Sequence, residues 1–298
     1  MLQEVFTVVA PVFIIAGVGY IWIKREQPFD NLTVSSLVMY VGSPCLIYSS
    51  LTTNAPGLEI LAQMALAALF VIVCSVGLAL AFLKITGWKY RTYLPALVHP
   101  NGGNMGLPVV LLAFGETGLA LGMAYFFVNS ISQYTLGLAV SSGEFHPTQL
   151  LKQPVIWAVL VVVIVLATET TMPRWFNATT SILGGITIPA MLLMLGTSLA
   201  RLNISSVRET LTVAIMRLAI GLVLGLAAIY QFDLTGMLAG VVLLQATMPA
   251  AVFNYVFAER YNREPDKVAA VILQSTVMSV LSLPLLVGWA LTFSQRNC

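Results

Sequence analysis

Amide side chains and helix-breaking residues occur together in one stretch of this chain, residues 95–108. Asn101 and Asn104 stand there among three prolines and three glycines. Proline removes a backbone donor and clashes with the preceding helical turn, and glycine permits unusual dihedral angles. We therefore predict an unwound stretch, followed by a half-helix that begins near Pro108. Unwound carbonyls, amides and the N-terminus of a half-helix can together hold a small anion or a cation.

A milder interruption of the same kind occurs at residues 245–254. Pro249 lies near its middle, and Gln245 and Asn254 lie at its ends. We predict that the two interrupted segments cross, with Pro108 and Pro249 at the crossing. The amides expected around it form the predicted substrate site: Asn101, Asn104, Gln245 and Asn254. The alternative is that these amides only cap and bridge broken helices, as amides commonly do inside membranes.

Weaker candidates lie on neighbouring segments. Ser43 precedes Pro44, and a kink at this proline could bring the hydroxyl to the same site. Asn129, Ser130 and Gln133 interrupt an apolar run, and they are equally compatible with substrate contact and with helix packing. The polar residues 274–276 of the last apolar segment have the same two interpretations.

Charged candidates are few. Arg217 lies about ten residues into its apolar segment, which is about 15 Å along a helix. An ionisable group inside a membrane is a functional candidate, so Arg217 could be a counter-charge for an anion; a snorkelling or packing arginine is the alternative. His99 is expected at the inner membrane interface. No acidic pair falls in the two interrupted stretches, which argues against carboxylate-based exchange of protons or sodium there.

The composition indicates which elements must position these residues. Hydrophobic residues make up 58% of the 298 residues and charged residues 9%, and the mean hydropathy is +0.91. Soluble domains carry about 25% charged residues, which excludes a soluble enzyme, a nucleic-acid-binding protein and a disordered scaffold. No metal-ligand spacing or phosphate loop occurs, and the three cysteines are scattered. We expect an integral membrane protein that is not an enzyme and that needs no metal or other cofactor.

A helix needs about 20 predominantly apolar residues to cross the hydrocarbon core. On that basis the chain contains ten candidate spans joined by short loops, and the first is read as a retained span because no basic region precedes it. The predicted spans are 5–23, 33–53, 59–83, 93–114, 118–141, 152–169, 181–200, 207–230, 235–258 and 267–293.

Basic residues are distributed unevenly between the two sets of loops. The even-numbered loops and the termini hold only Arg174 and Arg296. By the positive-inside rule, the termini are expected outside the cytoplasm. The odd-numbered loops hold eleven basic residues: Lys24, Arg25, Lys84, Lys89, Arg91, Lys152, Arg201, Arg208, Arg260, Arg263 and Lys267.

Two pairs of prolines suggest an internal repeat. Pro44 and Pro189 occupy the second and seventh predicted spans, and Pro108 and Pro249 occupy the fourth and ninth. Their offsets are 145 and 141 residues, which matches a division into five plus five spans. Because five is odd, the two halves must face opposite ways in the membrane. The expected division within a single membrane domain is a first repeat at 1–141, a short cytoplasmic linker at 142–151 and an inverted second repeat at 152–298.

Two sequence blocks resemble one transporter family. Asn-Gly-Gly-Asn-Met-Gly-Leu-Pro at 101–108, continuing to Ala-Phe-Gly-Glu-Thr-Gly-Leu at 113–119, resembles the fourth-helix signature of bacterial auxin efflux carriers. Gln-Ala-Thr-Met-Pro at 245–249 and Val-Phe-Ala-Glu-Arg-Tyr-Asn at 256–262 are similar to the C-terminal motif of that family, which includes plant PIN-type carriers. The resemblance extends over the whole chain in the number of spans.

The resemblance implies an all-α membrane fold of ten helices in two inverted five-helix repeats, like that of bile-acid sodium symporters and sodium/proton antiporters. Helices 4 and 9 would cross, and a mobile domain would move against a scaffold as an elevator. Implied substrates are small organic anions: auxin in plants, malonate or malate for some bacterial members. The long cytoplasmic loop of the plant carriers is missing at 142–151, so neither control through that loop nor auxin specificity is carried over.

We therefore expect a secondary active transporter of a small organic anion in a bacterial inner membrane. The coupling ion, proton or sodium, is left open, and the family makes a homodimer plausible. One alternative is an inorganic cation exchanger of the same fold, which the missing carboxylates disfavour. The other is a solute sensor that does not transport, which the lack of a recognisable signalling domain disfavours.

Overall fold

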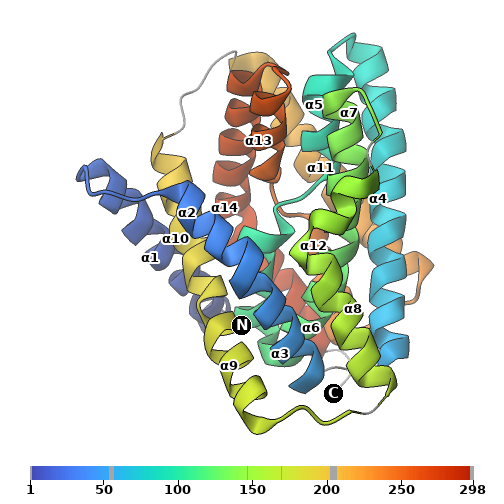
Figure 1. Ribbon diagram of the computed structural model, residues 1–298. Helices are drawn as coiled ribbons and strands as arrows, with labels where there is room; N and C mark the ends of the chain where they lie inside the picture. The colour runs from blue at the N-terminus through green and yellow to red at the C-terminus, as the bar shows by residue number, and fades with distance from the viewer. Residues whose placement is uncertain (1, 54–56, 146, 169, 202–206, 296–298) are drawn as a thin grey trace.

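A computed structural model describes residues 2–53, 57–145, 147–168, 170–201 and 207–295, and every regular element in these ranges is helical (Figure 1). Seven helices there are long and apolar enough to cross a membrane. They span Gln3–Lys24, Asn31–Thr53, Leu58–Thr86, Gly102–Ser142, Arg174–Arg201, Val207–Gln231 and Pro265–Ser294. Two shorter apolar helices, Pro154–Ala167 and Gly236–Ala246, accompany them.

The first half of the chain contains several helices that change geometry without ending. The elements are α1 (Leu2–Lys24), α2 (Asn31–Leu37), η1 (Val38–Gly42), α3 (Ser43–Thr53), α4 (Leu58–Thr86), α5 (Tyr90–Val98), η2 (Gly102–Gly106), α6 (Leu107–Ser132), η3 (Gln133–Gly137) and α7 (Leu138–Ser142). The segments η1, η2 and η3 are wide, π-helical turns that run directly into the α-helix after them.

The second half contains a short 3₁₀ turn and seven α-helices. The elements are η4 (Pro147–Lys152), α8 (Pro154–Ala167), α9 (Arg174–Gly185), α10 (Thr187–Arg201), α11 (Val207–Gln231), α12 (Gly236–Ala246), α13 (Phe253–Arg260) and α14 (Pro265–Gln295). The predicted ninth span is thus two helices, α12 and α13, with non-helical backbone between them.

The predicted unwound stretch at 95–108 is much shorter in the structure. Helix α5 continues through Pro95 to Val98, and a π-helical turn already begins at Gly102. The helical run therefore begins before Pro108, but its α-helical part, α6, begins at Leu107, next to the predicted position. Pro108 lies in the first turn of α6, where a helix does not need the N–H that proline lacks. A real change of direction follows at Gly115, whose φ of 67° lies in the left-handed region that glycine tolerates.

The helices pack in two groups. In one group α1 packs along α10, and α3 packs on α8 and α9. The backbones of α1 and α10 approach so closely that a Cβ at Gly196 would collide with the Ala16 carbonyl oxygen. In the other group α4, α5, α6, α11, α12, α13 and α14 pack on one another. Contacts between the two groups are sparser and involve mainly α1, α3 and α10 against α6, η2 and α14.

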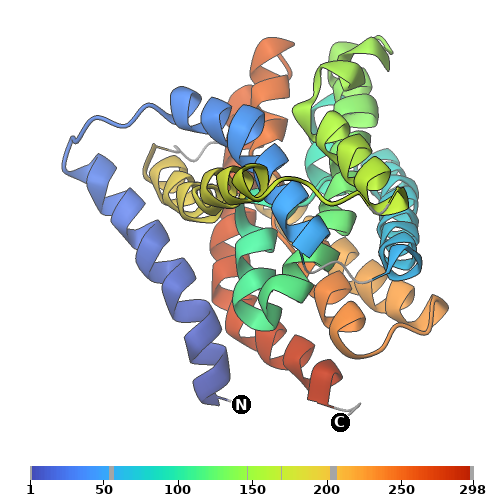
Figure 2. The same ribbon diagram turned by 60° about the horizontal axis from the view of Figure 1, so that its bottom comes forward.

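Polar contacts tie several loops together at one end of the bundle. Lys89 forms ion pairs across 3.2 Å with Glu264, and Lys267 pairs with Glu264 at 3.3 Å and Glu209 at 3.2 Å. Arg263 donates through Nε to the Ser141 carbonyl oxygen at 2.7 Å. These residues belong to the α4–α5 and α13–α14 connections and to the ends of α7, α11 and α14. The beginning of α1 and the end of α14 lie together at the opposite end (Figures 1 and 2).

Candidate functional site

The two interrupted segments meet through their backbones in the middle of the second group. Asn101 donates its N–H to the Pro249 carbonyl oxygen at 2.7 Å, and Ala251 donates to the His99 carbonyl oxygen at 3.0 Å. Pro100 and Ala250 thereby form an isolated antiparallel bridge. The bridge supplies the partners that a helix interruption must find inside a membrane protein. Pro249 takes part in this contact, whereas Pro100 occupies the place that the sequence predicted for Pro108.

Arg217 holds the helix ends that lead into the bridge. Its side chain is completely buried. Nη1 donates to the carbonyl oxygens of Leu97 at 2.8 Å and Val98 at 3.4 Å, at the end of α5. Nη2 and Nε donate to those of Ala246 at 2.6 Å and Met248 at 3.3 Å, at and just beyond the end of α12. Arg217 therefore does not snorkel, and its contacts are with backbone carbonyls, so the predicted role as a direct counter-charge is corrected.

These contacts determine the electrostatic balance of the bridge. A helix carries about half a negative charge at its C-terminus and half a positive charge at its N-terminus. The C-terminal ends of α5 and α12 together are thus offset by the single positive charge of Arg217. The N-terminal ends of η2 and α13, which begin at Gly102 and Phe253, have no such compensation from an acidic side chain. Among the described residues, no aspartate or glutamate is buried.

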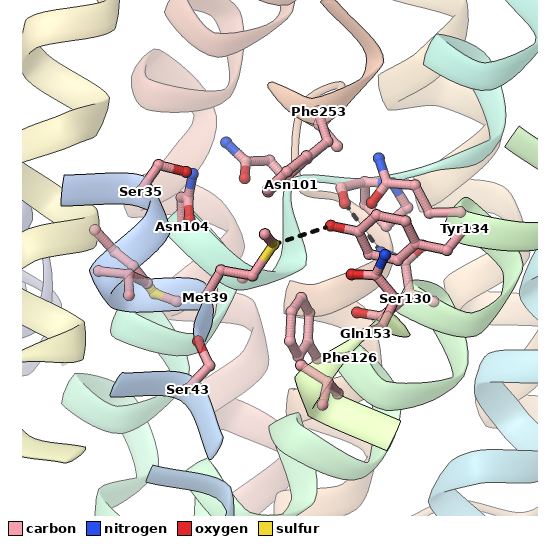
Figure 3. A pocket seen from close by; sticks show the side chains of 18 of the residues that line it. Ser35, Met39, Ser43, Asn101, Asn104, Phe126, Ser130, Tyr134, Gln153 and Phe253 are labelled. Carbon is pink, nitrogen blue, oxygen red and sulfur yellow. Dashed lines mark hydrogen bonds between the residues drawn. The ribbon is translucent and has the colours of Figure 1, made fainter. Parts of the chain in front are cut away.

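A cavity of about 60 Å³ opens beside the bridge, between the two groups of helices (Figure 3). This is less than half of the roughly 150 Å³ cavity that admits benzene in an engineered protein core. The lining contains amides and hydroxyls but no charged side chain. The predicted residues that line it are Ser43, Asn101, Asn104, Asn129 and Gln133. Such a lining suits a small polar solute.

All three π-helical turns of the described residues contribute to this lining. Val38 and Met39 come from η1, Asn104 from η2, and Gln133 and Tyr134 from η3. A π-helical turn inserts a residue into an α-helix and is frequent at functional sites. Their convergence on one cavity, from segments far apart in the chain, marks it as the candidate site.

Several amides around the cavity have unused hydrogen-bonding capacity. Asn129 donates through Nδ2 to the Pro100 carbonyl oxygen at 3.3 Å, and Gln133 donates to Asn254 Oδ1 at 3.2 Å. The buried atoms Asn129 Oδ1, Asn101 Nδ2 and Asn254 Nδ2 have no partner. A buried polar group without a partner costs about 1–3 kcal/mol. These atoms are therefore available to a bound solute or to water.

Gln245 lies behind the cavity and does not line it. It is the second-last residue of α12, is completely buried, and both polar atoms of its side chain lack a partner. A Cβ added at Gly102 or Gly106 would come within 2.7 Å of Oε1, so both glycines leave room for this amide. The Gln245 amide thus packs against the π-helical turn η2, whereas Asn254 is connected to the cavity through Gln133.

The sequence did not single out several residues that line the cavity. Met39 and Tyr134 approach each other across it, with the Tyr134 hydroxyl donating to the Met39 sulfur at 3.5 Å (Figure 3). Ser35, Ser130 and Gln153 complete its polar rim. Ser130 was among the weaker candidates, and Tyr134 directly follows the predicted Gln133, so extending that prediction by one residue would have found it. Ser35 and Gln153 carry no such signal.

His99 also differs from its prediction. It was expected at the membrane interface, but its side chain is completely buried at the bridge. Ser275, from the polar residues 274–276, accepts the Ala250 N–H at 3.2 Å and so supports the bridge. Within the described ranges, no three histidine, cysteine, aspartate or glutamate residues are grouped to hold a metal ion.

Comparison with known proteins identifies the class to which this fold and cavity belong. A family model described as a membrane transport protein matches residues 4–144 and 138–287. The chain therefore belongs to this family, which is that of the auxin efflux carriers. The resemblance inferred from the two sequence blocks is confirmed.

Archaeal relatives cover nearly the whole chain. One uncharacterized transporter, from Methanothermobacter thermautotrophicus, is 28% identical over 86% of this chain and 88% of its own length. A second uncharacterized transporter, from Methanocaldococcus jannaschii, is 24% identical over 95% of this chain and 98% of its own. The protein is thus a membrane transporter by family.

Proposed function

We propose that this transporter carries a small organic anion, such as malonate or another short carboxylate, through the cavity beside the bridge. The observation that carries the proposal is the charge balance. Arg217 offsets the negative ends of α5 and α12, while two helix N-termini face the cavity region without a buried carboxylate among the described residues. The resulting local potential is positive and attracts an anion.

The same observation disfavours exchange of inorganic cations. Exchange of cations through a carboxylate needs an acidic side chain at the site, and the lining offers only neutral oxygens. A non-transporting sensor is disfavoured by the family, whose described relatives are named as transporters.

We further propose an elevator motion between the two groups of helices. The cavity receives Met39 and Met191 from the first group, and Asn104 and Tyr134 from the second. A second cavity of about 230 Å³, lined almost entirely by apolar residues of α3, α4, α6 and α8, also lies between the groups. Incomplete packing along a boundary makes sliding along it less costly.

Ten membrane crossings in two inverted repeats are part of this proposal. Besides the seven long helices, α8 crosses once, α12 and α13 together cross once, and the kink at Gly115 divides the Gly102–Ser142 segment into two crossings. An even number agrees with the ends of α1 and α14 lying on the same side (Figure 2). We place those ends outside and the Lys89–Glu264 network inside, in the cytoplasmic membrane, following the basic residues. A homodimer and a coupling ion, proton or sodium, complete the proposal.

The proposed anion is tested by thermal unfolding of the purified protein with mono- and dicarboxylates, each with and without sodium. Because a ligand that binds only the folded state stabilises it by mass action, we expect a concentration-dependent rise in Tm with a short carboxylate. Stabilisation by sodium alone, with no response to any carboxylate, would favour the cation exchanger instead.

A further inference from the structure

His99 is a buried titratable residue. Its backbone takes part in the bridge, but its side chain does not. Its ring is completely buried, and neither Nδ1 nor Nε2 has a hydrogen-bond partner. Its carbonyl oxygen accepts the Ala251 N–H, which places the residue directly at the meeting of the two interrupted segments. A buried group with unused polar atoms calls for an explanation.

The surroundings of the ring connect it to the cavity. A Cβ at Gly137, in η3, would lie 3.1 Å from Nε2, so the glycine makes room for the imidazole. Asn129 donates through Nδ2 to the carbonyl oxygen of Pro100, the residue after His99, and its Oδ1 is without a hydrogen-bond partner. Asn129 also lines the cavity, as do Pro100 and Asn101, the next residues after His99. A positive charge on the imidazole ring would thus act electrostatically on a solute in the cavity.

The charged groups around His99 are unequally placed. Helix α11 contributes Arg217, whose guanidinium donates hydrogen bonds to the carbonyl oxygens of Leu97 and Val98, the two residues before His99. Tyr125 of α6 is buried and neutral at ordinary pH. The other charged residues of α5, and of the helices that pack on α5 and η3, are not buried: Glu59, Lys84, Arg91, Glu116, Lys152, Arg208, Glu209, Glu259, Arg260, Asp266 and Lys267. Arg217 is therefore the completely buried charged side chain beside His99 among the described residues.

This arrangement makes protonation depend on whether the cavity is occupied. With the cavity empty, a second buried positive charge beside Arg217 is unfavourable, because both burial and a like charge oppose it. An anion in the cavity supplies the missing opposite charge, and Asn129 Oδ1 offers an acceptor for a ring N–H. Anion binding and protonation then favour each other, and thermodynamic linkage requires that the coupling be reciprocal.

We propose that His99 is the proton-binding residue of this transporter: the ring takes up one proton when a carboxylate enters the cavity and releases it when the carboxylate leaves. The proposal rests on the organic-anion function above and assigns its coupling ion. One carboxylate and one proton would cross together, so the loaded carrier would hold one negative charge fewer than with the anion alone.

Calorimetry with malonate tests the proton count. Heats are measured near neutral pH in two buffers of different ionisation enthalpy, for the unaltered protein, His99→Gln and His146→Gln. The last removes the only other histidine of the chain, which lies outside the described residues, and serves as the matched control. We expect close to one proton taken up per malonate in the unaltered and His146→Gln proteins and close to none in His99→Gln. Equal uptake in all three would overturn the proposal.

A second measurement does not depend on the stability of His99→Gln. In His146→Gln labelled with ¹⁵N-histidine, His99 is the only histidine that gives an imidazole signal. We expect the signal of a neutral ring without malonate and that of a protonated ring with it. A ring that stays neutral while malonate binds would overturn the assignment of His99 alone. No binding of malonate or any other short carboxylate by the unaltered protein would overturn the proposed anion function, and this inference with it.

Discussion

Asn101 and Pro249, 148 positions apart in the chain, are joined by a backbone hydrogen bond of 2.7 Å. Each belongs to a segment in which a helix stops and another begins. Their pairing turns two local interruptions into one structure, with helix C-termini on Arg217 and helix N-termini towards the cavity. The predictions below test the parts of this structure separately.

Removing the guanidinium of Arg217 should destabilise the fold. Arg217→Met leaves the carbonyls of Leu97 and Ala246 buried without a donor, and each such group costs about 1–3 kcal/mol. We expect a fall in Tm of at least about 5 °C, given that 1 kcal/mol corresponds to about 2–4 °C for large domains. Arg208→Met, an exposed position on the same helix, is the control. A Tm equal to that of the control would contradict the role of Arg217.

The close approach of α11 to α12 should not tolerate a methyl group. A Cβ at Gly221 would run into the Ala246 carbonyl oxygen, and overpacking of this kind costs about 1–3 kcal/mol. Gly221→Ala should therefore lower Tm and the yield of folded protein. Gly77→Ala, on α4, meets nothing within 4 Å and should leave Tm unchanged or slightly raised, because alanine favours a helix by up to about 1 kcal/mol. Comparable effects of both changes would refute the packing argument.

Asn104 should contribute more to the binding of the solute than to the stability of the fold. Its side chain lines the cavity and is only partly buried, so Asn104→Ala leaves no fully buried partner unpaired. We expect an affinity for the transported carboxylate at least about tenfold weaker, equivalent to 1.4 kcal/mol, with Tm of the ligand-free protein unchanged. Binding is followed by ligand-induced thermal shifts and uptake by proteoliposomes, with the exposed Gln231→Ala as control. Unaltered affinity and uptake would remove Asn104 from the site.

The ion pairs of Glu264 with Lys89 and Lys267 should make a small contribution to the free energy of unfolding that depends on pH. Partial burial alone would raise the pKa of the Glu264 carboxyl, but hydrogen bonds from Lys89, Thr92 and Lys267 outweigh it, and the pKa lies below its ordinary value. A lowered folded-state pKa contributes stability above the unfolded pKa, and that stability is lost as the pH falls through the folded pKa.

Glu264→Gln should accordingly be less stable than the unaltered protein at pH 7, by no more than about 1 kcal/mol because the group is partly exposed. The difference should shrink once the pH falls below about 4.5, the ordinary value for this carboxyl. Thermal unfolding across that range, with the exposed Glu116→Gln as control, checks the sign. A difference that grows on acidification would show that the ion pairs are not its cause.

The proposed orientation predicts which engineered cysteines react in intact cells. With Cys45, Cys74 and Cys298 replaced by serine, Arg174→Cys should be labelled by a membrane-impermeant maleimide. Lys89→Cys, in the network with Glu264, should be labelled only after the cells are opened. The reverse pattern would invert the proposed topology.

The positions of the helices follow from local sequence rules. Long apolar runs, together with prolines and glycines, predicted many helix ends to within a few residues, including the beginning of α11 at Val207 and the interruption around Pro249. They did not predict the beginning of α9 at Arg174, which was expected at residue 181. Hydrophobicity and backbone restrictions act within one segment, so the order of residues is sufficient to find them. The family followed from two such segments, and the family model confirmed it.

The partners of those interruptions were decided only by tertiary structure. Whether Pro100 or Pro108 meets the second segment, and whether Arg217 faces lipid, an anion or four carbonyl oxygens, depends on how helices far apart in the chain are placed. The same is true of His99, which is completely buried where its backbone pairs with that of Ala251. Local sequence determined where the chain must break, because backbone preferences are local. The fold determined what the broken ends contact, because buried charges and unpaired polar groups are satisfied only by residues that packing brings together.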